Sequence, residues 1–404
     1  MLTGNQQLMK EINRMAIIKL LQTHGLLSRA EIARVANLSR STVSGLVSEL
    51  IDLGIVIEQE KDRSKGGRKP MLLSINEAGG VILGIDLGGT KIVGGVVNLR
   101  AQVLKRLHRP TPKDPDEVVV ALIELIRDLL DTPEAIASEI KGIGIACPGL
   151  VDREHGTVVD AGNLRWRNVP LEDKIKKEFG LLTVIENDTN AAALGEKHYG
   201  VGTGVDSLIY VAIGTGIGAG LIVNGLLFRG AFNGAGEVGH MHVLDSGPQC
   251  VCGRRGCLEA LTSGPAIGRR AVELLLEGRH SSLLMEAYKK NGALTAEEVA
   301  LAAKEGDTLA TAVFTEAGRY IGLALGNLAN SFNPSMIVLG GGVAKAGTVL
   351  LEPVRQAVNE IALTSHNKGL QVVLTSLGDD AGIVGAATLV LNQLFSPVDL
   401  RRSK

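Results

Sequence analysis

The segment Gly84-Ile85-Asp86-Leu87-Gly88-Gly89-Thr90-Lys91 is rich in glycine and ends in two polar side chains. It follows an apolar run that is typical of a strand, and its glycines allow the backbone to approach a phosphate closely. Two further glycine-rich turns follow apolar runs, at residues 213–218 and 339–343. One such turn is a weak signal, but three at strand ends predict a nucleotide that is held from two sides. The candidate nucleotide-binding residues are Asp86, Gly88, Gly89, Thr90, Lys91, Gly214, Thr215, Gly216 and Gly341.

Short apolar runs alternate with helical segments from residue 81 onward, which predicts an α/β domain. Residues 207–228 carry no charge over 22 positions. Their many glycines favour two buried strands joined by a turn over a membrane span. A long helix is expected over residues 308–330. The expected strands are residues 81–85, 91–97, 142–146, 182–185, 208–213, 336–339 and 370–374.

The composition is that of an ordinary soluble globular protein, with 404 residues of which 45% are hydrophobic and 21% charged. The length suggests two or three domains. A net charge of -1 excludes a wholly basic nucleic-acid coat, yet it leaves room for a local basic patch. The first residues lack a basic segment followed by an apolar one, so we expect no signal peptide and a cytoplasmic protein.

The first 55 residues carry helical patterns. Ser28-Arg29-Ala30-Glu31 forms a capping box, so a short helix is expected at about 29–36. After a turn at Asn37-Leu38-Ser39, another helix begins near Arg40. Gly25 is placed to end a first helix. The apolar stripe of the first helix is Leu8, Ile12, Met15 and Leu20, and the buried face of the last is Val43, Leu46, Val47 and Leu50.

Two short helices joined by a tight turn, the second exposing small polar residues, predict a helix-turn-helix that reads DNA. A generic three-helix bundle shares this pattern. Residues 55–58 and 71–75 are expected to be strands, and the basic tip between them resembles a wing that meets phosphates or the minor groove. A solvated charged loop is the alternative for that tip. The DNA-binding candidates are Arg40, Ser41, Thr42, Ser44, Arg68 and Lys69, and the tip also carries Lys61, Arg63 and Lys65.

Glu186-Asn187-Asp188-Thr189-Asn190 comes at the end of an expected strand, before an alanine-rich helix. A carboxylate at that place could accept a proton from a substrate hydroxyl. Capping of the helix by Asp188 or Asn187 explains the same residues equally well. Two later segments, at residues 236–240 and 258–259, add polar groups that could bind several hydroxyls.

His240, Cys250, Cys252 and Cys257 provide one imidazole and three thiolates, which is a complete tetrahedral zinc set of the structural kind. Buried thiols beside an unrelated histidine are the alternative. His242 is a second candidate histidine, because it follows His240 by two residues. Cys147 is expected to be a small core residue.

In this order, the motifs resemble the ROK family (repressors, open reading frames and kinases) over nearly the whole chain. They are D-L-G-G-T-K at 86–91, C-P-G-L-V-D at 147–152, E-N-D-T-N at 186–190, G-T-G-I-G-A-G at 214–220, G-E-V-G-H at 236–240 and C-V-C-G-R-R-G-C-L-E at 250–259. The resemblance implies an actin/hexokinase-type ATPase fold of two lobes. The N-terminal winged helix, with G-G-R-K-P at 66–70, looks like the family's repressor branch.

The resemblance also implies roles for individual residues. Asp188 would be the catalytic base in a kinase, and Asp86 would help to position Mg-ATP. Asn163 is a weaker candidate for the sugar site. The implied sugar contacts are Asn187, Asp188, Glu237, His240 and Glu259, and the implied zinc ligands are His240, Cys250, Cys252 and Cys257.

We therefore expect a winged helix-turn-helix domain at 1–78 and a ROK sugar-kinase-like domain at 79–404. Its first lobe would be about 79–190 plus the C-terminal helix, and its second lobe about 191–380. The first hypothesis is a sugar-responsive repressor that binds operator DNA as a homodimer or homotetramer. The second is an ATP-dependent sugar kinase and the third a bifunctional protein, because the first phosphate loop and E-N-D at 186–188 are both intact.

Overall fold

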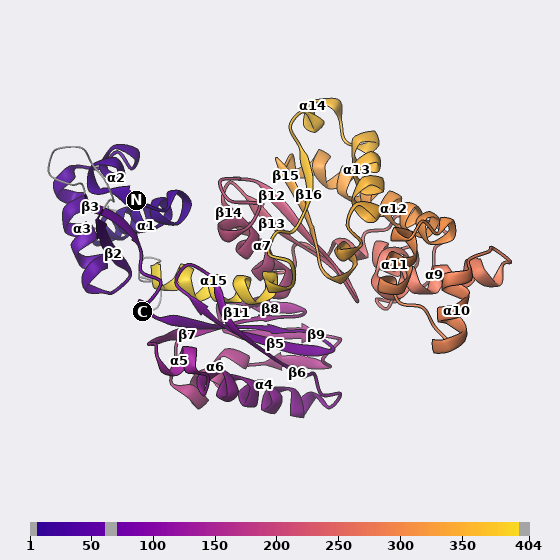
Figure 1. Ribbon diagram of the computed structural model, residues 1–404, viewed down its shortest axis with the longest axis horizontal. Helices are drawn as coiled ribbons and strands as arrows, with labels where there is room; N and C mark the ends of the chain where they lie inside the picture. Colours follow the sequence, from indigo (N-terminus) through magenta and orange to yellow (C-terminus); the bar gives the residue numbers. More distant parts are fainter. Residues whose placement is uncertain (1–5, 61–70, 396–404) are drawn as a thin grey trace. The chain divides into compact units, whose positions relative to one another are not determined.

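A computed structural model describes residues 6–60 and 71–395. The chain forms two compact units (Figure 1). The first runs to Tyr199 and resumes at Gly382, and the second comprises Gly200–Ala381.

The N-terminal part of the first unit is a winged helix-turn-helix. Its helices are α1 (Gln6–His24), α2 (Arg29–Val35) and α3 (Arg40–Asp52). Its sheet has the order β1-β3-β2, from β1 (Leu27–Ser28), β2 (Val56–Glu60) and β3 (Met71–Ile75). The predicted capping box is confirmed, because Ser28 accepts the Glu31 N–H and Glu31 accepts the Ser28 N–H. The tip at 61–70, with Arg68 and Lys69, lies outside the described residues.

The expected buried faces of these helices are only partly right. Val43, Leu46, Val47 and Leu50 of α3 are buried, as predicted. In α1 the predicted stripe is wrong at Ile12, whose side chain is 47% exposed. Among the residues of α1 whose side chains the structure describes, the buried hydrophobic ones are Ile17, Ile18 and Leu21, all in the second half of the helix.

A five-stranded sheet forms the body of the first unit, in the order β11-β7-β4-β5-β6. Strands β4 (Val81–Leu87), β5 (Lys91–Asn98) and β6 (Val103–Pro110) are antiparallel, while β7 (Ile140–Cys147) and β11 (Thr183–Asn187) run parallel to β4. A smaller sheet contains β8 (Leu150–Asp152), β9 (Thr157–Ala161) and β10 (Trp166–Val169).

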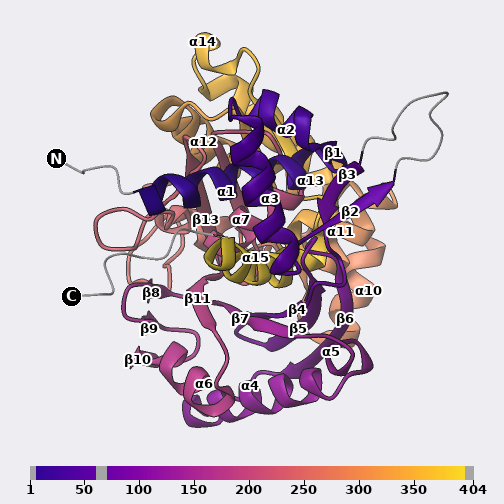
Figure 2. The same ribbon diagram turned by 90° about the vertical axis from the view of Figure 1, so that its left-hand side faces the viewer.

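Helices cover both faces of the larger sheet. On one face lie α4 (Pro115–Leu130) and α6 (Leu171–Phe179), with the short α5 (Pro133–Ile136) at the end of α4 (Figure 2). On the other lie α7 (Asp188–Tyr199) and α15 (Ala381–Phe395). Glycines bring α15 against the strands, since a Cβ at Gly144 would lie 1.9 Å from the Ala386 carbonyl oxygen.

The second unit is built on a sheet of order β14-β13-β12-β15-β16. The strands are β12 (Leu208–Ile213), β13 (Ile217–Val223), β14 (Leu226–Phe228), β15 (Met336–Gly340) and β16 (Gln371–Leu374). The uncharged stretch at 207–228 therefore contains β12 and β13, the two buried strands expected, and also the short and largely exposed β14, which was not expected. Among the described residues, none of the helices is long and apolar enough to cross a membrane.

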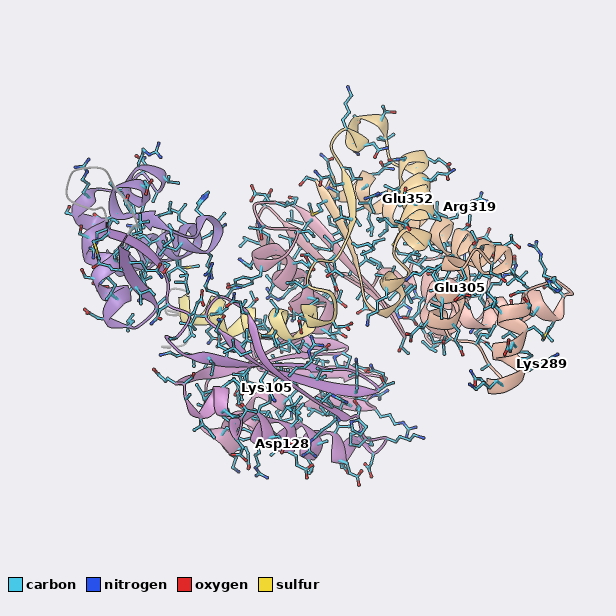
Figure 3. All side chains as sticks on the ribbon, viewed as in Figure 1. Lys105, Asp128, Lys289, Glu305, Arg319 and Glu352 are labelled. Atoms are coloured by element: carbon cyan, nitrogen blue, oxygen red, sulfur yellow. The ribbon has the colours of Figure 1, made fainter. Side chains whose placement is uncertain are left out.

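Two long helices, α12 (Thr308–Phe332) and α13 (Thr348–Ile361), pack together in the second unit. The remaining elements are α8 (Leu258–Thr262), α9 (Gly264–Leu276), α10 (Ser282–Asn291), α11 (Ala296–Lys304), α14 (Thr364–Asn367), and the 3-10 turns η1 (Val238–His240), η2 (Gly342–Ala346) and η3 (Gly378–Asp380). Charged side chains such as Arg319 of α12 and Glu352 of α13 lie on the outside of these helices (Figure 3).

Candidate functional site

The first glycine turn joins β4 to β5 in the first unit. The Gly88 N–H donates to the Lys91 carbonyl at 3.0 Å, which closes the turn. Gly89, Thr90 and Lys91 are exposed. Thr111 supports the turn, because its hydroxyl donates to the Gly88 carbonyl at 2.7 Å and its N–H to the Thr90 carbonyl at 3.0 Å.

Asp86 lies near the end of β4, just before this turn. Burial and the Asp188 carboxylate raise the pKa of its carboxyl and Lys91 lowers it, with a net value of about 7. Asp188 and Lys91 therefore each lie close enough to Asp86 to interact with it electrostatically. The start of α15 closes over the carboxyl, since a Cβ at Gly382 would lie 2.4 Å from Asp86 Oδ2.

Asn187 and Asp188 stand at the junction of β11 and α7, as predicted. Asn187 caps the helix, because its Oδ1 accepts the N–H groups of Thr189 and Asn190, both at 3.0 Å. Its amide donates to the Gly149 carbonyl at 3.1 Å. Asp188 is the first helical residue, and its Oδ1 accepts from the Thr189 N–H at 2.7 Å and hydroxyl at 3.2 Å. Capping therefore accounts for Asn187, whereas the carboxylate of Asp188 is held in place without being the cap.

The second and third glycine turns are neighbours in the second unit. The β12–β13 turn holds Gly214, Thr215 and Gly216, and the third turn follows β15, which pairs in parallel with β12. A Cβ at Gly341 would lie 2.5 Å from the Ile213 carbonyl oxygen. These turns therefore meet at the carboxyl ends of adjacent parallel strands, where α/β proteins commonly bind ligands.

Glu259 of α8 is bound to the β12–β13 turn. Its Oε2 accepts the Ile217 N–H at 3.0 Å and would lie 2.8 Å from a Cβ at Gly216. Its Oε1 lies 4.0 Å from Cys250 Sγ. One carboxylate thus touches both the predicted nucleotide turn and the cysteine cluster. Glu237, just before η1, is exposed.

His240, Cys250, Cys252 and Cys257 come together, with one ligand atom from each within 4.8 Å of the others. His240 ends η1, and Cys257 directly precedes α8. The Cys250 Sγ lies 3.6 Å from His240 Nδ1, and the Cys252 and Cys257 sulfurs are 3.7 Å apart. The N–H and guanidinium of Arg254 lower the pKa of the Cys252 thiol to about 6, which favours the thiolate that binds metals. The cluster could hold a metal ion.

His242, the other candidate histidine, has polar partners of its own. Its Nδ1 lies 3.0 Å from the Arg255 carbonyl and its Nε2 2.9 Å from Asp245 Oδ1. Both ring nitrogens thus face acceptors, and the contact with Asp245 raises the pKa of the imidazole. Cys147 is buried in β7, as expected of a core residue.

The candidate DNA-reading residues lie at the start of α3. Arg40, Ser41 and Ser44 are exposed. Thr42 is half-buried, and its N–H and hydroxyl contact the Ser39 hydroxyl at 3.1 and 2.8 Å, so its main contacts are those of a helix cap.

Two residues that position these groups gave no signal in the sequence. Thr111 supports the first glycine turn from the segment after β6, and Arg29 joins α2 to β2 through Glu58 at 2.8 Å. Each acts through a contact with residues distant in sequence, and neither has a local motif that could have revealed it.

Known proteins match both parts of the chain. A model of the ROK family matches residues 82–393, and a winged helix-turn-helix DNA-binding model matches residues 10–57. The xylose repressor of Caldicellulosiruptor bescii is 34% identical over 395 residues, which are 97% of this chain and 98% of that protein. The glucokinase of Halalkalibacterium halodurans is 36% identical over 314 residues, which are 77% of this chain and 95% of the kinase.

A solved structure matches the fold over nearly the whole length. It is a ROK family transcriptional regulator described as a homologue of the E. coli MLC protein. It has a TM-score of 0.83 and 29% identity, and the match covers 96% of this chain and 97% of that one. The resemblance expected from the motifs is confirmed, and this chain belongs to the ROK family.

Proposed function

We propose that this protein is a sugar-responsive transcriptional repressor of carbohydrate-metabolism genes. The observation that carries the proposal is the fusion of the winged helix-turn-helix to the ROK domain. A relative named as a xylose repressor matches 97% of the chain, whereas the glucokinase matches only 77% and leaves the DNA-binding part uncovered. Operator DNA and a sugar are the implied partners, and the protein would act as a homodimer or homotetramer.

The proposed sugar contacts are the polar groups that the family resemblance implies. Asn187 and Asp188 offer an amide and a carboxylate at the N-terminus of α7. Glu237, His240 and Glu259 would add contacts from the second unit. With the Nδ1 of His240 facing Cys250, Nε2 is the ring nitrogen that would meet a hydroxyl. For such binding to release DNA, the sugar must prefer one conformation over the other.

Zinc is the metal that we assign to the cysteine cluster. A tetrahedral ion with Zn–S of about 2.3 Å and Zn–N of about 2.0 Å places two sulfurs about 3.8 Å apart and a sulfur and nitrogen about 3.6 Å apart. The observed separations of 3.7 and 3.6 Å fit these values. Four protein ligands close the site, so the ion would brace the loop before α8 and take no part in bond making.

An ATP-dependent sugar kinase, alone or combined with repression, is the second candidate. It is favoured by the intact first glycine turn and by Asp188, whose carboxylate interacts electrostatically with Asp86 near that turn. In this role Asp188 would take the proton of the attacking sugar hydroxyl, and Asp86 would help to position Mg2+ and ATP.

One set of measurements distinguishes the two functions. The full chain would select an operator duplex from random DNA, and its affinity for that duplex would then be measured with xylose, glucose, other pentoses and hexoses, and N-acetylhexosamines. ATP consumption would be followed with the same sugars. We expect one sugar to weaken operator binding while phosphorylation stays weak or absent.

Asp188→Asn sharpens the comparison, because it keeps the shape of the side chain but removes its basicity. In a sensor it should only weaken the sugar response. In a kinase it should lower turnover by 10²–10⁴-fold, while operator binding without sugar survives. Brisk wild-type turnover of a sugar that leaves operator affinity unchanged would establish the kinase instead.

A further inference from the structure

Helix α7 connects the candidate sugar residues to the place where the chain leaves the first unit. Asp188 is its first residue and Tyr199 its last. Twelve residues at about 1.5 Å per residue make a rod roughly 18 Å long. The chain enters the second unit at Gly200, directly after Tyr199. A displacement at Asp188, or at the connection to the second unit after Tyr199, would therefore act directly on an end of this helix.

The helix is buried and closely packed along most of its length. Every residue from Thr189 to Lys197 is buried. Helix α15 lies directly on its backbone, because a Cβ at Gly385 would come within 2.2 Å of the Ala191 carbonyl oxygen. Since packed interiors do not deform continuously, a displacement of one end of α7 is carried to the other.

The far end of α7 contacts the DNA-binding head. The Tyr199 hydroxyl accepts a hydrogen bond from Gln22 Nε2 of α1 at 2.8 Å, across 177 residues of sequence. Burial and the charges of Lys197 and of Lys19, one turn earlier on α1, together lower the pKa of the neighbouring His198 to about 4. The imidazole is therefore neutral at pH 7. Lys19 and Gln22 share one helix face, so this face of α1 meets the end of α7.

Helix α1 also packs on the DNA-reading helix. Its residues Ile17, Ile18 and Leu21 belong to the buried core of the head. Lys10 of α1 pairs with Glu49 of α3 at 2.7 Å. A shift of α1 would therefore reposition α3, whose first residues are the DNA-binding candidates.

We propose that Tyr199 and Gln22 are positioning residues that transmit the effect of sugar binding from the N-terminus of α7 to the DNA-binding head. This proposal rests on the proposed repressor function. The hydrogen bond between them is present in one of the two states, with or without sugar, and is broken or lengthened in the other. Its free energy then contributes to the coupling between the sugar and DNA sites.

The test uses the full chain, its selected operator duplex and a sugar that releases the wild type. The measured quantity is the ratio of operator Kd at saturating sugar to operator Kd without sugar. Tyr199→Phe removes only the hydroxyl, and Gln22→Met removes the donor at similar volume. Tyr288→Phe, on α10 of the other unit, is the matched control.

We expect each single variant to change the Kd ratio by about 2- to 12-fold, the range that one hydrogen bond provides. The double variant should change it no further, because the same bond is lost in each. The control should match the wild type. A merely structural role would lower the thermal midpoint or shift both operator affinities equally, leaving the ratio unchanged.

Each other outcome has a defined meaning. If the wild type responds to sugar and Tyr199→Phe responds equally, the inference is wrong and the proposed function stands. Effects that add in the double variant would also overturn it. A wild type whose operator affinity no sugar changes would refute the proposed function and leave this contact nothing to transmit.

Discussion

Replacing Asp86 by Asn should stabilise the first unit, and the gain should grow as the pH rises. The carboxyl is enclosed by the start of α15 and lies within electrostatic reach of Asp188. Folding therefore favours its protonated form and raises its pKa from 3.8 to about 7. Asn has the same shape but carries no charge, so it fits the same space without the cost of ionisation.

The raised pKa fixes the sign and size of the effect. The folded state keeps the Asp86 proton to a higher pH than the unfolded state does. The contribution of Asp86 to the free energy of unfolding is therefore fully present below pH 4 and is lost as the pH rises through about 7. With pKa values of 3.8 and about 7, the loss between pH 5 and pH 8 is about 2.5 kcal/mol. The free energy of unfolding of Asp86→Asn relative to the wild type should rise by that amount over the same interval.

The assay uses the single tryptophan of the chain. Trp166 is buried in the first unit and donates to the Pro115 carbonyl at 3.0 Å, so its fluorescence follows the unfolding of that unit. Urea titrations at pH 5 and pH 8 would be compared for the wild type, Asp86→Asn and Asp160→Asn, an exposed carboxylate of β9. If Asp86→Asn and the wild type change in parallel between the two pH values, the carboxylate is already ionised at pH 5 and the reasoning is refuted.

Two further predictions concern the metal and the DNA. Cys252→Ser should lower the zinc content, the thermal midpoint and the sugar affinity. The control Val251→Ala, at an exposed residue of the same loop, should leave all three quantities unchanged. Elemental analysis that finds no zinc in freshly purified wild type would exclude the site. Changing Arg68 and Lys69 together to Ala should weaken operator binding and reduce the log–log salt slope by about 0.9 for each lost phosphate contact; an unchanged slope and affinity would show that the basic tip is only a solvated loop.

The parts of the fold that could be predicted are those with local signals. The Ser28–Glu31 capping box and the period of Val43 to Leu50 depend on residues a few positions apart, so they were readable without tertiary contacts. The same is true of the uncharged stretch at 207–228, where glycines between β-branched residues indicated strands and turns. Spacing also singled out the four cluster residues that the structure brings together.

The parts that could not be predicted depend on long-range packing. Gly144 is required because α15, more than two hundred residues later, lies on its strand. The Gln22–Tyr199 bond joins residues without a shared motif. The error in α1 has the same origin, because amphipathic spacing indicates a face but not how much of the helix the rest of the domain covers.

Glycine in the three turns can have either of two physical causes: close packing within the chain, or the close approach of a bound group to the backbone. A Cβ would lie 2.8 Å from the Lys91 carbonyl at Gly88 and 2.8 Å from Glu259 at Gly216. At Gly341 the φ of +81° adds strain for any other residue. Contacts with backbone atoms therefore explain glycine at 88 and 341, whereas the atom beside Gly216 is the end of a side chain, which could shift.

Gly214 differs, because among the described residues nothing lies within 4 Å of the place where its Cβ would stand, and its φ is not in the left-handed region. Its N–H closes the turn by donating to the Gly216 carbonyl at 2.9 Å, which any residue could do. Gly342, in the third turn, is equally open and its φ is also outside the left-handed region. The packing of the described residues therefore does not require glycine at 214 or 342, and the close approach of a phosphate to these two positions stays a prediction.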